Sequence, residues 1–575
     1  MSQEESELPG SDALPPAFIS FLSTPLLLYS TVDLLRGVAY TTSRKSPYPH
    51  PTDSPTKNQD EGLTYERKSD PGRLRHLLAI LFHERVPRSH EPYIKGCMTL
   101  RSTRVASSFL ALHIQFDSLP ILITMSTTRD PNGYLRRRPG PTGGRLSRYG
   151  GWLPAQPAVY REFLKSHRQL ARQRRRDAVE HVPVVAQFEK TIRSDPVMSH
   201  LMDQIFLQVA KVPDFDNIDN FEELLYAMDE IVTTAPKFQV AKDEHGNTVG
   251  DTVGCPMYLI LDLPSNTSAG YDLFRMPAFN KAMADVLNEW GRYLTTPDSG
   301  NVLNETDKGW FSPLSLASLE EGRGDFNSTY VCPEPDSPNR GFTSWDAFFT
   351  RAFQPSARPV IASHDKSIIH NACESTVYAI SRNVMKHDQF WLKAQPYSLY
   401  DMLNQNDEDA EMFVGGTVFQ AYLSPEDYHR WHAPIDGVIT KTVLVPGAYF
   451  AALPDEGAEE DDPDLKPGDP HGASTRSQGW LTVASVRALI FIKADNPAIG
   501  TVCFIGVGMS EVSTCETTVR PGDRVRTGDQ LGMFHFGGSS HALIFTAHAK
   551  ITFADDVQVD KHLWLNSVIA QVKEE

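Results

Sequence analysis

The hydrophobic pattern of this 575-residue chain changes its period near residue 340, and this change limits the folds that are open to the chain. Before that point, apolar residues recur at i, i+3, i+4 and i+7, which is the spacing of one face of a helix. Asp195 followed by Pro196 is typical of a helix start. Three such apolar stripes lie in residues 201–209, 221–232 and 279–290.

Beyond residue 340 the apolar runs become short and rich in β-branched residues, and turn residues separate them. This pattern predicts strands, because a buried strand reads as a brief apolar run between glycine, proline and polar residues. The runs lie at 437–445, 488–494, 501–508 and 541–553. The fold class that we expect is therefore α+β, with a helical N-terminal domain followed by a β-rich domain that is an antiparallel sheet or barrel-like.

A chain of this length exceeds one compact core, so we expect more than one domain. Residues 1–125 show no clean period of 2 or 3.6, and we predict a poorly ordered or atypical extension there. The helical domain is expected at 126–335 and the β-rich domain at 336–575. Inside the latter, the acidic insert 453–472 is predicted to be an exposed, mobile loop.

The net charge of −17 argues against a general nucleic-acid binder, which needs a basic surface. Residues 17–29 and 105–125 are too short or too polar to span a bilayer, although 13–39 is a weak candidate for membrane docking. The six cysteines form no C-x-x-C pair, which favours reduced thiols and a cytoplasmic location. A small-molecule ligand is thus expected, with no nucleic acid and no dependence on a membrane.

Three separate stretches carry candidate chemistry. They are IIHNACESTV at 368–377, SPEDYHRWHAPIDG at 424–437 and FGGSSHALIF at 536–545. The last is unusual because two glycines and two serines lead directly into what reads as a buried strand, whereas a glycine pair normally marks a turn.

A metal site is the first alternative for the histidine-rich stretch. His432 and Asp436 have the spacing of half of a zinc peptidase site, which needs two further closely spaced histidines. His541 and His548 are too far apart to supply them, so no metal is expected.

Taken together, these motifs resemble the phosphatidylserine decarboxylase family. The segments that carry the resemblance are SWDAFFTRAFQPSARPV at 344–360, DYHRWHAPIDG at 427–437 and GDRVRTGDQLGMFHFGGSS at 522–540, in the order of that family. The GWLP and GWFSP segments of the helical region resemble a soluble fungal branch, which includes an L-tryptophan decarboxylase. Residues 1–125 match nothing in this family.

The resemblance implies that the chain cuts its own backbone between Gly538 and Ser539. Ser539 then becomes a covalent pyruvoyl group, so neither pyridoxal phosphate nor a metal is needed. The two products, 1–538 and 539–575, are expected to stay together because the second begins with a core strand.

The resemblance also assigns roles to three further residues. His432 is the base that takes the proton of Ser539, and Glu374 orients it, although most relatives have aspartate at that position. His429 is the proton donor or the group that positions the substrate carboxylate during decarboxylation.

Three functions remain open at this point. The first is decarboxylation of an aromatic L-amino acid to its amine and CO2, with tryptophan as the leading substrate. The second is decarboxylation of phosphatidylserine to phosphatidylethanolamine. The third, from another class, is a non-catalytic scaffold, against which the retention of Ser539, His432 and His429 argues.

Overall fold

The computed structural model describes residues 149, 152–212, 217–387, 397–462, 464–511 and 514–573. All of them belong to one of the two units of the chain, Pro120–Glu575. The prediction for residues 1–125 lies outside the described residues.

Helices occupy the first part of the described chain, as the apolar stripes predict. Helix α4 starts where the sequence predicts. Asp195 is its N-cap, with a side chain that accepts hydrogen bonds from the backbone amides of Val197 and Met198, and Pro196 is its first residue. The helices are α2 (Pro157–Arg176), α3 (Pro183–Ser194), α4 (Pro196–Val209), α5 (Phe221–Val232), α6 (Pro256–Ser265), α7 (Ser268–Leu273), α8 (Pro277–Leu294), the 3₁₀ helix η1 (Pro297–Val302), α9 (Pro313–Glu320), α10 (Phe326–Thr329) and α11 (Trp345–Phe349). A small hairpin of β1 (Phe238–Lys242) and β2 (Thr248–Thr252) lies among them.

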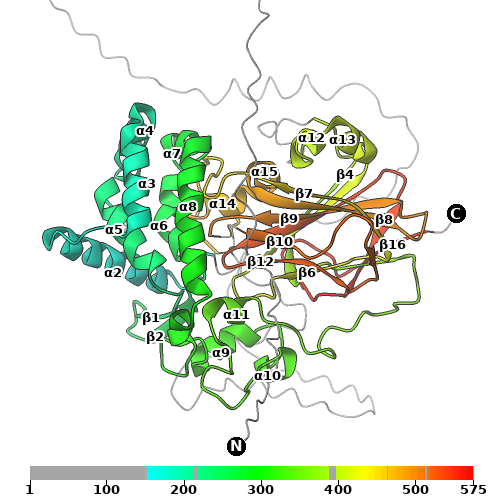
Figure 1. Cartoon of the computed structure of the whole chain (residues 1–575), viewed down its shortest axis with the longest axis horizontal. Coiled ribbons are helices and arrows are strands. Elements are labelled where there is room, and N and C mark those ends of the chain that lie inside the picture. Colours follow the sequence, from blue (N-terminus) through cyan, green and yellow to red (C-terminus); the bar gives the residue numbers. More distant parts are fainter. Residues whose placement is uncertain are drawn as a thin grey trace, which may run out of the picture. The chain divides into compact units, whose positions relative to one another are not determined.

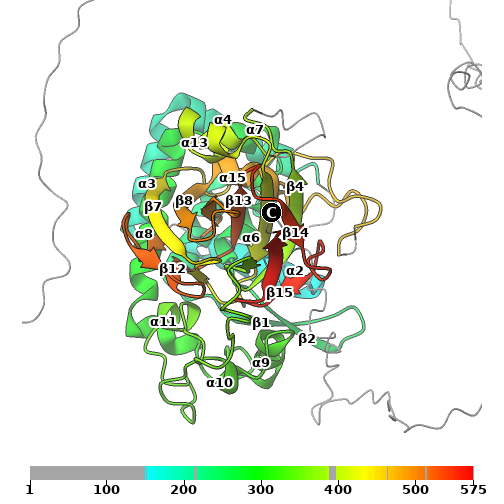
Figure 2. The same ribbon diagram turned by 90° about the vertical axis from the view of Figure 1, so that its right-hand side faces the viewer.

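Strands dominate after α11, with four short helices between them. The strands are β3 (Ile368–His370), β4 (Ser375–Arg382), β5 (Thr417–Leu423), β6 (Arg430–His432), β7 (Gly437–Val445), β8 (Val486–Ala494), β9 (Thr501–Gly508), β10 (Thr514–Thr517), β11 (Arg524–Val525), β12 (Gln530–His535), β13 (Ser539–Phe545), β14 (Ile551–Phe553), β15 (His562–Leu563) and β16 (Val568–Val572). The helices are α12 (Leu399–Met402), α13 (Asp407–Phe413), α14 (Ala473–Arg476) and α15 (Gln478–Ala484). In Figure 1 the helices α2 to α8 lie to one side of these strands, and in Figure 2 the strands face the viewer. The α+β prediction is confirmed.

The largest sheet has eight strands in the order β11-β7-β8-β9-β13-β5-β4-β15, and its pairs are antiparallel. The order ends at β11 on one side and β15 on the other, so the sheet is open. The barrel-like alternative is therefore wrong, and the antiparallel sheet is what forms. Two three-stranded sheets, β10-β12-β6 and β14-β16-β3, accompany it.

Strand β13 lies inside this sheet, and all seven of its residues are buried. It pairs with β5 on one side and β9 on the other. Successive side chains alternate between two apolar cores, with Leu543 and Phe545 in one and Ala542 and Ile544 in the other. A strand enclosed on both faces needs an unbroken apolar run, which explains the sequence HALIF.

Many described residues of the acidic insert 453–472 are exposed, as expected, and some of them form hydrogen bonds to residues outside the insert. Arg476 donates to both carboxylate oxygens of Asp455, at 2.5 and 2.8 Å, and the hydroxyl of Tyr149 donates to Asp462 at 2.8 Å. Its sequence gave no sign of these partners, because both lie outside the insert.

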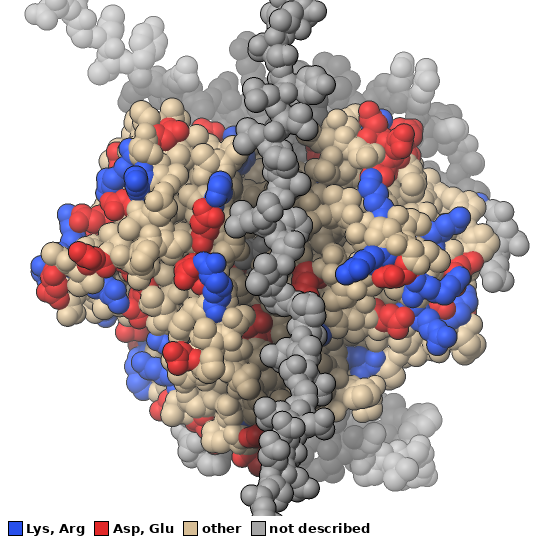
Figure 3. Space-filling model, in the orientation of Figure 1, with Lys and Arg blue, Asp and Glu red and all other residues tan. Residues whose placement is uncertain are grey.

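On the face shown in Figure 3, acidic and basic side chains are interspersed.

Candidate active site

The junction between β12 and β13 needs glycine. Phe536 has a φ of +31° and Gly537 a φ of +103°, so the chain passes through the left-handed region just before the strand. At Gly538, a Cβ would lie 2.5 Å from Nε1 of Trp152, whose indole donates to the carbonyl of Leu423 at 2.9 Å. A residue with a side chain therefore does not fit at position 538 unless Trp152 moves.

Ser539 is the first residue of β13 and is fully buried. It pairs with Leu423 of β5 and Gly508 of β9. Because side chains alternate along a strand, its side chain points to the same face of the sheet as that of Leu543. Its Oγ has no hydrogen-bond partner among the described residues. A buried hydroxyl without a hydrogen-bond partner costs about 1–3 kcal/mol of stability.

His432 lies at the end of β6, and both of its ring nitrogens have partners. Nδ1 lies 2.7 Å from the carbonyl oxygen of Gly528, and Nε2 lies 3.0 Å from the hydroxyl of Tyr428. Because a carbonyl only accepts, Nδ1 carries the proton and Nε2 is the acceptor. Burial lowers the pKa of His432, although the bond to Gly528 opposes this. The ring is thus a neutral base, oriented by a backbone carbonyl.

Glu374 is fully buried just before β4 and belongs to an ion pair. Arg358 donates to it through Nη2 at 2.6 Å and through Nε at 3.0 and 3.1 Å, and the amide of Leu565 donates at 2.7 Å. Within the described part of the chain, no hydrogen bond joins Glu374 to His432. The structure therefore brings Glu374 to Arg358, a partner that sequence spacing did not indicate.

His429 is fully buried and stacks on Phe349, with ring centroids 3.9 Å apart. Neither ring nitrogen has a hydrogen-bond partner among the described residues. Burial, with the nearby charge of Arg351, lowers the pKa of His429 to about 3. The ring is therefore neutral at physiological pH.

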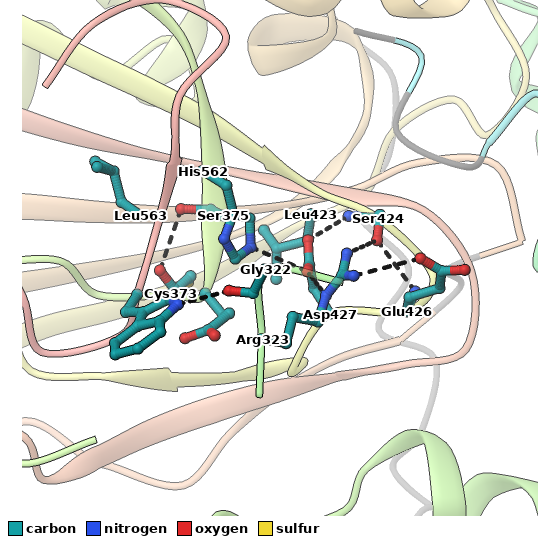
Figure 4. Close-up of polar contacts among 12 residues, drawn as sticks. Gly322, Arg323, Cys373, Ser375, Leu423, Ser424, Glu426, Asp427, His562 and Leu563 are labelled. Carbon is teal, nitrogen blue, oxygen red and sulfur yellow. Dashed lines mark hydrogen bonds and ion pairs between the residues drawn. The ribbon is translucent and has the colours of Figure 1, made fainter. Parts of the chain in front are cut away.

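A buried cluster of charges follows β5, beyond the residue that pairs with Ser539 (Figure 4). Arg323, from the segment after α9, donates to Asp427 at 2.6 Å and to Ser424 at 2.9 Å. Nε2 of His562 lies 3.2 Å from the same carboxylate oxygen of Asp427. Burial acts to raise the pKa of Asp427, but Arg323 and His562 outweigh it and hold this pKa well below its usual range.

This cluster was missed from the sequence. Asp427 stood in the DYHRWH segment that we singled out, but Arg323 and His562 lie in separate segments of the chain that carry no motif of their own. Their pairing is a tertiary contact, for which a single sequence holds no periodic signal.

Known proteins are similar to both the helical region and the β-rich region of this chain. Two phosphatidylserine decarboxylase family models match, one at residues 182–319 and the other at 345–571. The chain is 56% identical over 346 residues to decarboxylase iboD of Amanita muscaria, which covers 60% of this chain and 99% of that protein. It is 34% identical over 406 residues to the L-tryptophan decarboxylases of Psilocybe cubensis and Psilocybe cyanescens, which covers 68% of this chain and 87% of each of them.

Across the described ranges, no helix is both long enough and apolar enough to cross a bilayer. The second family match, at residues 345–571, contains the four predicted site residues Glu374, His429, His432 and Ser539. The chain therefore belongs to the phosphatidylserine decarboxylase family, and it is a carboxy-lyase.

Proposed function

We propose that this protein is a pyruvoyl-dependent amino-acid decarboxylase that cuts itself between Gly538 and Ser539. The observation that supports this most is the Ser539 hydroxyl, which is fully buried without a partner at the start of a central strand. An unpaired hydroxyl directly after two glycines fits a residue that is consumed in maturation. When formed, the pyruvoyl group supplies a ketone that withdraws electrons as the substrate carboxylate leaves.

In this proposal self-cleavage takes place in two steps, an acyl shift from nitrogen to oxygen and then an elimination. Oγ of Ser539 bonds to the carbonyl carbon of Gly538 while its proton passes to a base, and the peptide C–N bond breaks as the Ser539 nitrogen gains a proton. Loss of the Ser539 α-proton expels Gly538 as a carboxylate and leaves dehydroalanine. Water then converts this residue to the keto-acyl end and releases ammonia.

His432 is the base in this proposal. Its Nδ1 proton is fixed by the Gly528 carbonyl, which leaves Nε2 free of a proton, as a base requires. The hydroxyl of Tyr428 lies 3.0 Å from that nitrogen, and among the described residues no hydrogen bond joins His432 to Ser539. Proton transfer therefore requires Nε2 to exchange the Tyr428 hydroxyl for that of Ser539. Glu374 accepts hydrogen bonds from Arg358, in the segment between α11 and β3, and from Leu565, in the segment between β15 and β16, and in this proposal it holds these two segments together.

His429 acts on the substrate rather than on the backbone. Its lowered pKa, about 3, favours a neutral ring that donates an N–H to the substrate carboxylate over a ring that supplies a proton from the charged form. Its unpartnered nitrogens are available for that contact.

Replacing the two histidines separately is expected to separate the two steps. His432→Ala should remain a single uncut chain, whereas His429→Ala should be cut and lose decarboxylation by about 10²-fold or more, as expected for a lost proton-transfer or positioning group. Intact-mass spectrometry reports the cut, and CO2 release reports turnover. Normal turnover by His429→Ala would remove the role given to it.

The substrate that we favour is a free aromatic amino acid, with L-tryptophan first. Two relatives that are named L-tryptophan decarboxylases match over 87% of their length. Phosphatidylserine is the second candidate, because both matching family models bear its name.

The proposal is tested on the purified wild-type protein. We expect two species by intact mass, 1–538 and 539–575, the smaller with a blocked N-terminus, and amine release from L-tryptophan within a panel of amino acids and phosphatidylserine vesicles. An unbroken chain in a preparation that releases CO2 would contradict the pyruvoyl mechanism. Product from the vesicles alone would move the substrate to the lipid.

A further inference from the structure

The short junction that leads into β13 is contacted by two tryptophans of the helical region. This junction, residues 536–538, joins β12 to the strand that begins with Ser539. Trp152 lies in the segment before α2, and Trp290 lies in α8. Both side chains are buried, and each packs on one end of the junction.

Trp152 packs on the glycine at the end of the junction. A Cβ at Gly538 would lie 2.5 Å from Nε1, 2.8 Å from Cδ1 and 2.9 Å from Cε2 of Trp152, so the edge of the indole covers the Cα of this glycine. The indole N–H donates to the carbonyl of Leu423 at 2.9 Å, and Leu423 is the residue of β5 that pairs with Ser539. The ring is therefore fixed to the strand beside the serine and lies against the residue whose carbonyl carbon is attacked in the proposed cut.

Trp290 packs on the start of the junction. Its ring meets that of Phe536 edge to face, with the ring centroids 5.5 Å apart. Its indole N–H donates to the carbonyl of Thr234, in the segment after α5, at 2.9 Å. At the next residue of α8, Gly291, a Cβ would lie 3.1 Å from the Phe536 ring. The helix therefore approaches Phe536 closely, and a hydrogen bond fixes the ring that contacts it.

The backbone between these two contacts needs support from outside. Phe536 has a φ of +31° and Gly537 a φ of +103°. The first value is unfavourable for a residue with a side chain, and a glycine has many other conformations open to it. Residues in such conformations persist only where their surroundings fix them. Here Trp290 contacts Phe536 and Trp152 contacts Gly538.

We propose that Trp152 and Trp290 are positioning residues for self-cleavage, which hold the junction so that the Gly538 carbonyl lies in the path of Ser539 Oγ. The proposal rests on the self-cleavage proposed above and adds that the helical region takes part in it. An intramolecular attack is fast only where the reacting atoms are close and aligned, and a displacement of about 1 Å can cost about 10²-fold in rate. Loss of either ring frees one end of the junction to leave that geometry.

The test follows the cut of freshly translated full-length chains over time by intact-mass spectrometry. We expect Trp152→Leu and Trp290→Leu each to be cut at least about tenfold more slowly than the wild type. Because loss of a buried tryptophan also lowers stability, the thermal midpoint of each variant is measured in the Ser539→Ala background, which is expected to stay uncut.

Trp310→Leu is the matched control. Trp310 is also fully buried in the helical region, and its N–H donates to the carbonyl of Pro236 at 2.8 Å. Its ring packs on Trp345 and Phe348 of α11. We expect Trp310→Leu to lose a similar amount of stability and to be cut at the wild-type rate. An equal slowing in all three leucine variants would show that lost stability, and not lost positioning, causes it.

A second substitution tests the contact itself and decides the question even if the leucine variants fail to fold. The φ of Gly538 is not positive, and the three atoms nearest to an added Cβ all belong to Trp152. Gly538→Ala should therefore be cut slowly, and adding Trp152→Leu, which removes Nε1, should make the cut faster than in Gly538→Ala alone. Independent effects of the two changes, or a wild-type rate in Gly538→Ala, would overturn the positioning role and leave self-cleavage standing. A wild type that is never cut would instead overturn the proposed function.

Discussion

Alanine at position 539 is expected to leave the chain uncut and to abolish decarboxylation. The reason is chemical, because in the proposed mechanism Ser539 supplies both the nucleophile of the backbone cut and the atoms of the group that the cut creates. We expect a single full-length species by intact mass and no amine or CO2 above background. Release of amine by Ser539→Ala would show that another group performs the reaction.

The fold should survive this change. The Ser539 hydroxyl is buried without a hydrogen bond, so alanine removes a polar group that no partner stabilises. Such a replacement is near neutral or stabilising, unlike the loss of one half of a hydrogen-bonded pair. The thermal midpoint of Ser539→Ala is therefore expected to match or exceed that of an uncut wild type.

Ser540→Ala is the matched control. Ser540 is also fully buried with an unpartnered hydroxyl, but it shares the strand face of Ala542 and Ile544. It points away from the face that carries Ser539, so its loss should leave both the cut and the turnover intact. An uncut Ser540→Ala would place the nucleophile one residue further along.

The sequence predicted the strands more closely than the site. The runs at 437–445 and 501–508 coincide with β7 and β9, because β-branched residues between glycine and proline turns define a strand locally. The run at 541–553 was one segment in the sequence but is two strands in the structure, and the first begins at Ser539 itself. The extra residues at the start of β13 are serines, and nothing in the local sequence indicates that a serine at a strand end pairs with a strand on each side.

The two histidines and Ser539 were predicted as site residues from their motifs, and this stays a prediction, whereas the contacts that the structure gives these side chains could not be predicted from the sequence. Glu374 was expected beside His432 and is bonded to Arg358, while His432 takes its orientation from Gly528. The carbonyl of any residue can fill that role, so nothing in the sequence marks it. Trp152 belonged to a noted motif, but its contact with Gly538 depends on how the first helices pack on the sheet.

Asparagine at position 427 is expected to destabilise the whole described unit. It would remove the main negative partner of Arg323, whose side chain is 1% exposed, and leave a buried positive charge largely uncompensated. Breaking one half of a buried ion pair costs about 3–5 kcal/mol, which is a large share of the stability of an ordinary domain. The measurement is the urea midpoint of the purified variant, or its soluble yield if it does not accumulate.

The pH dependence of the stability that Asp427 contributes follows from the direction in which folding shifts its pKa. The folded-state pKa of Asp427 is held well below its usual range, so the stabilisation by its charge is present above the unfolded value of about 4. It is lost as the pH falls through the folded-state pKa. The difference in stability between the wild type and Asp427→Asn should therefore stay constant from pH 5 to 8 and narrow only in strong acid.

The control for Asp427→Asn removes both charges, because a buried ion pair replaced as a unit by apolar residues is often close to neutral. Arg323→Met combined with Asp427→Leu should recover most of the lost stability, although Ser424 and Glu426 lose a partner. The same comparison can be made on the proposed cut protein, because a non-covalent contact joins His562, in the 539–575 segment, to the Asp427 carboxylate. Asp427→Asn should release that fragment at lower urea than the wild type, whereas equal retention would show that the pairings of β13, β15 and β16 with the larger fragment hold it without this contact.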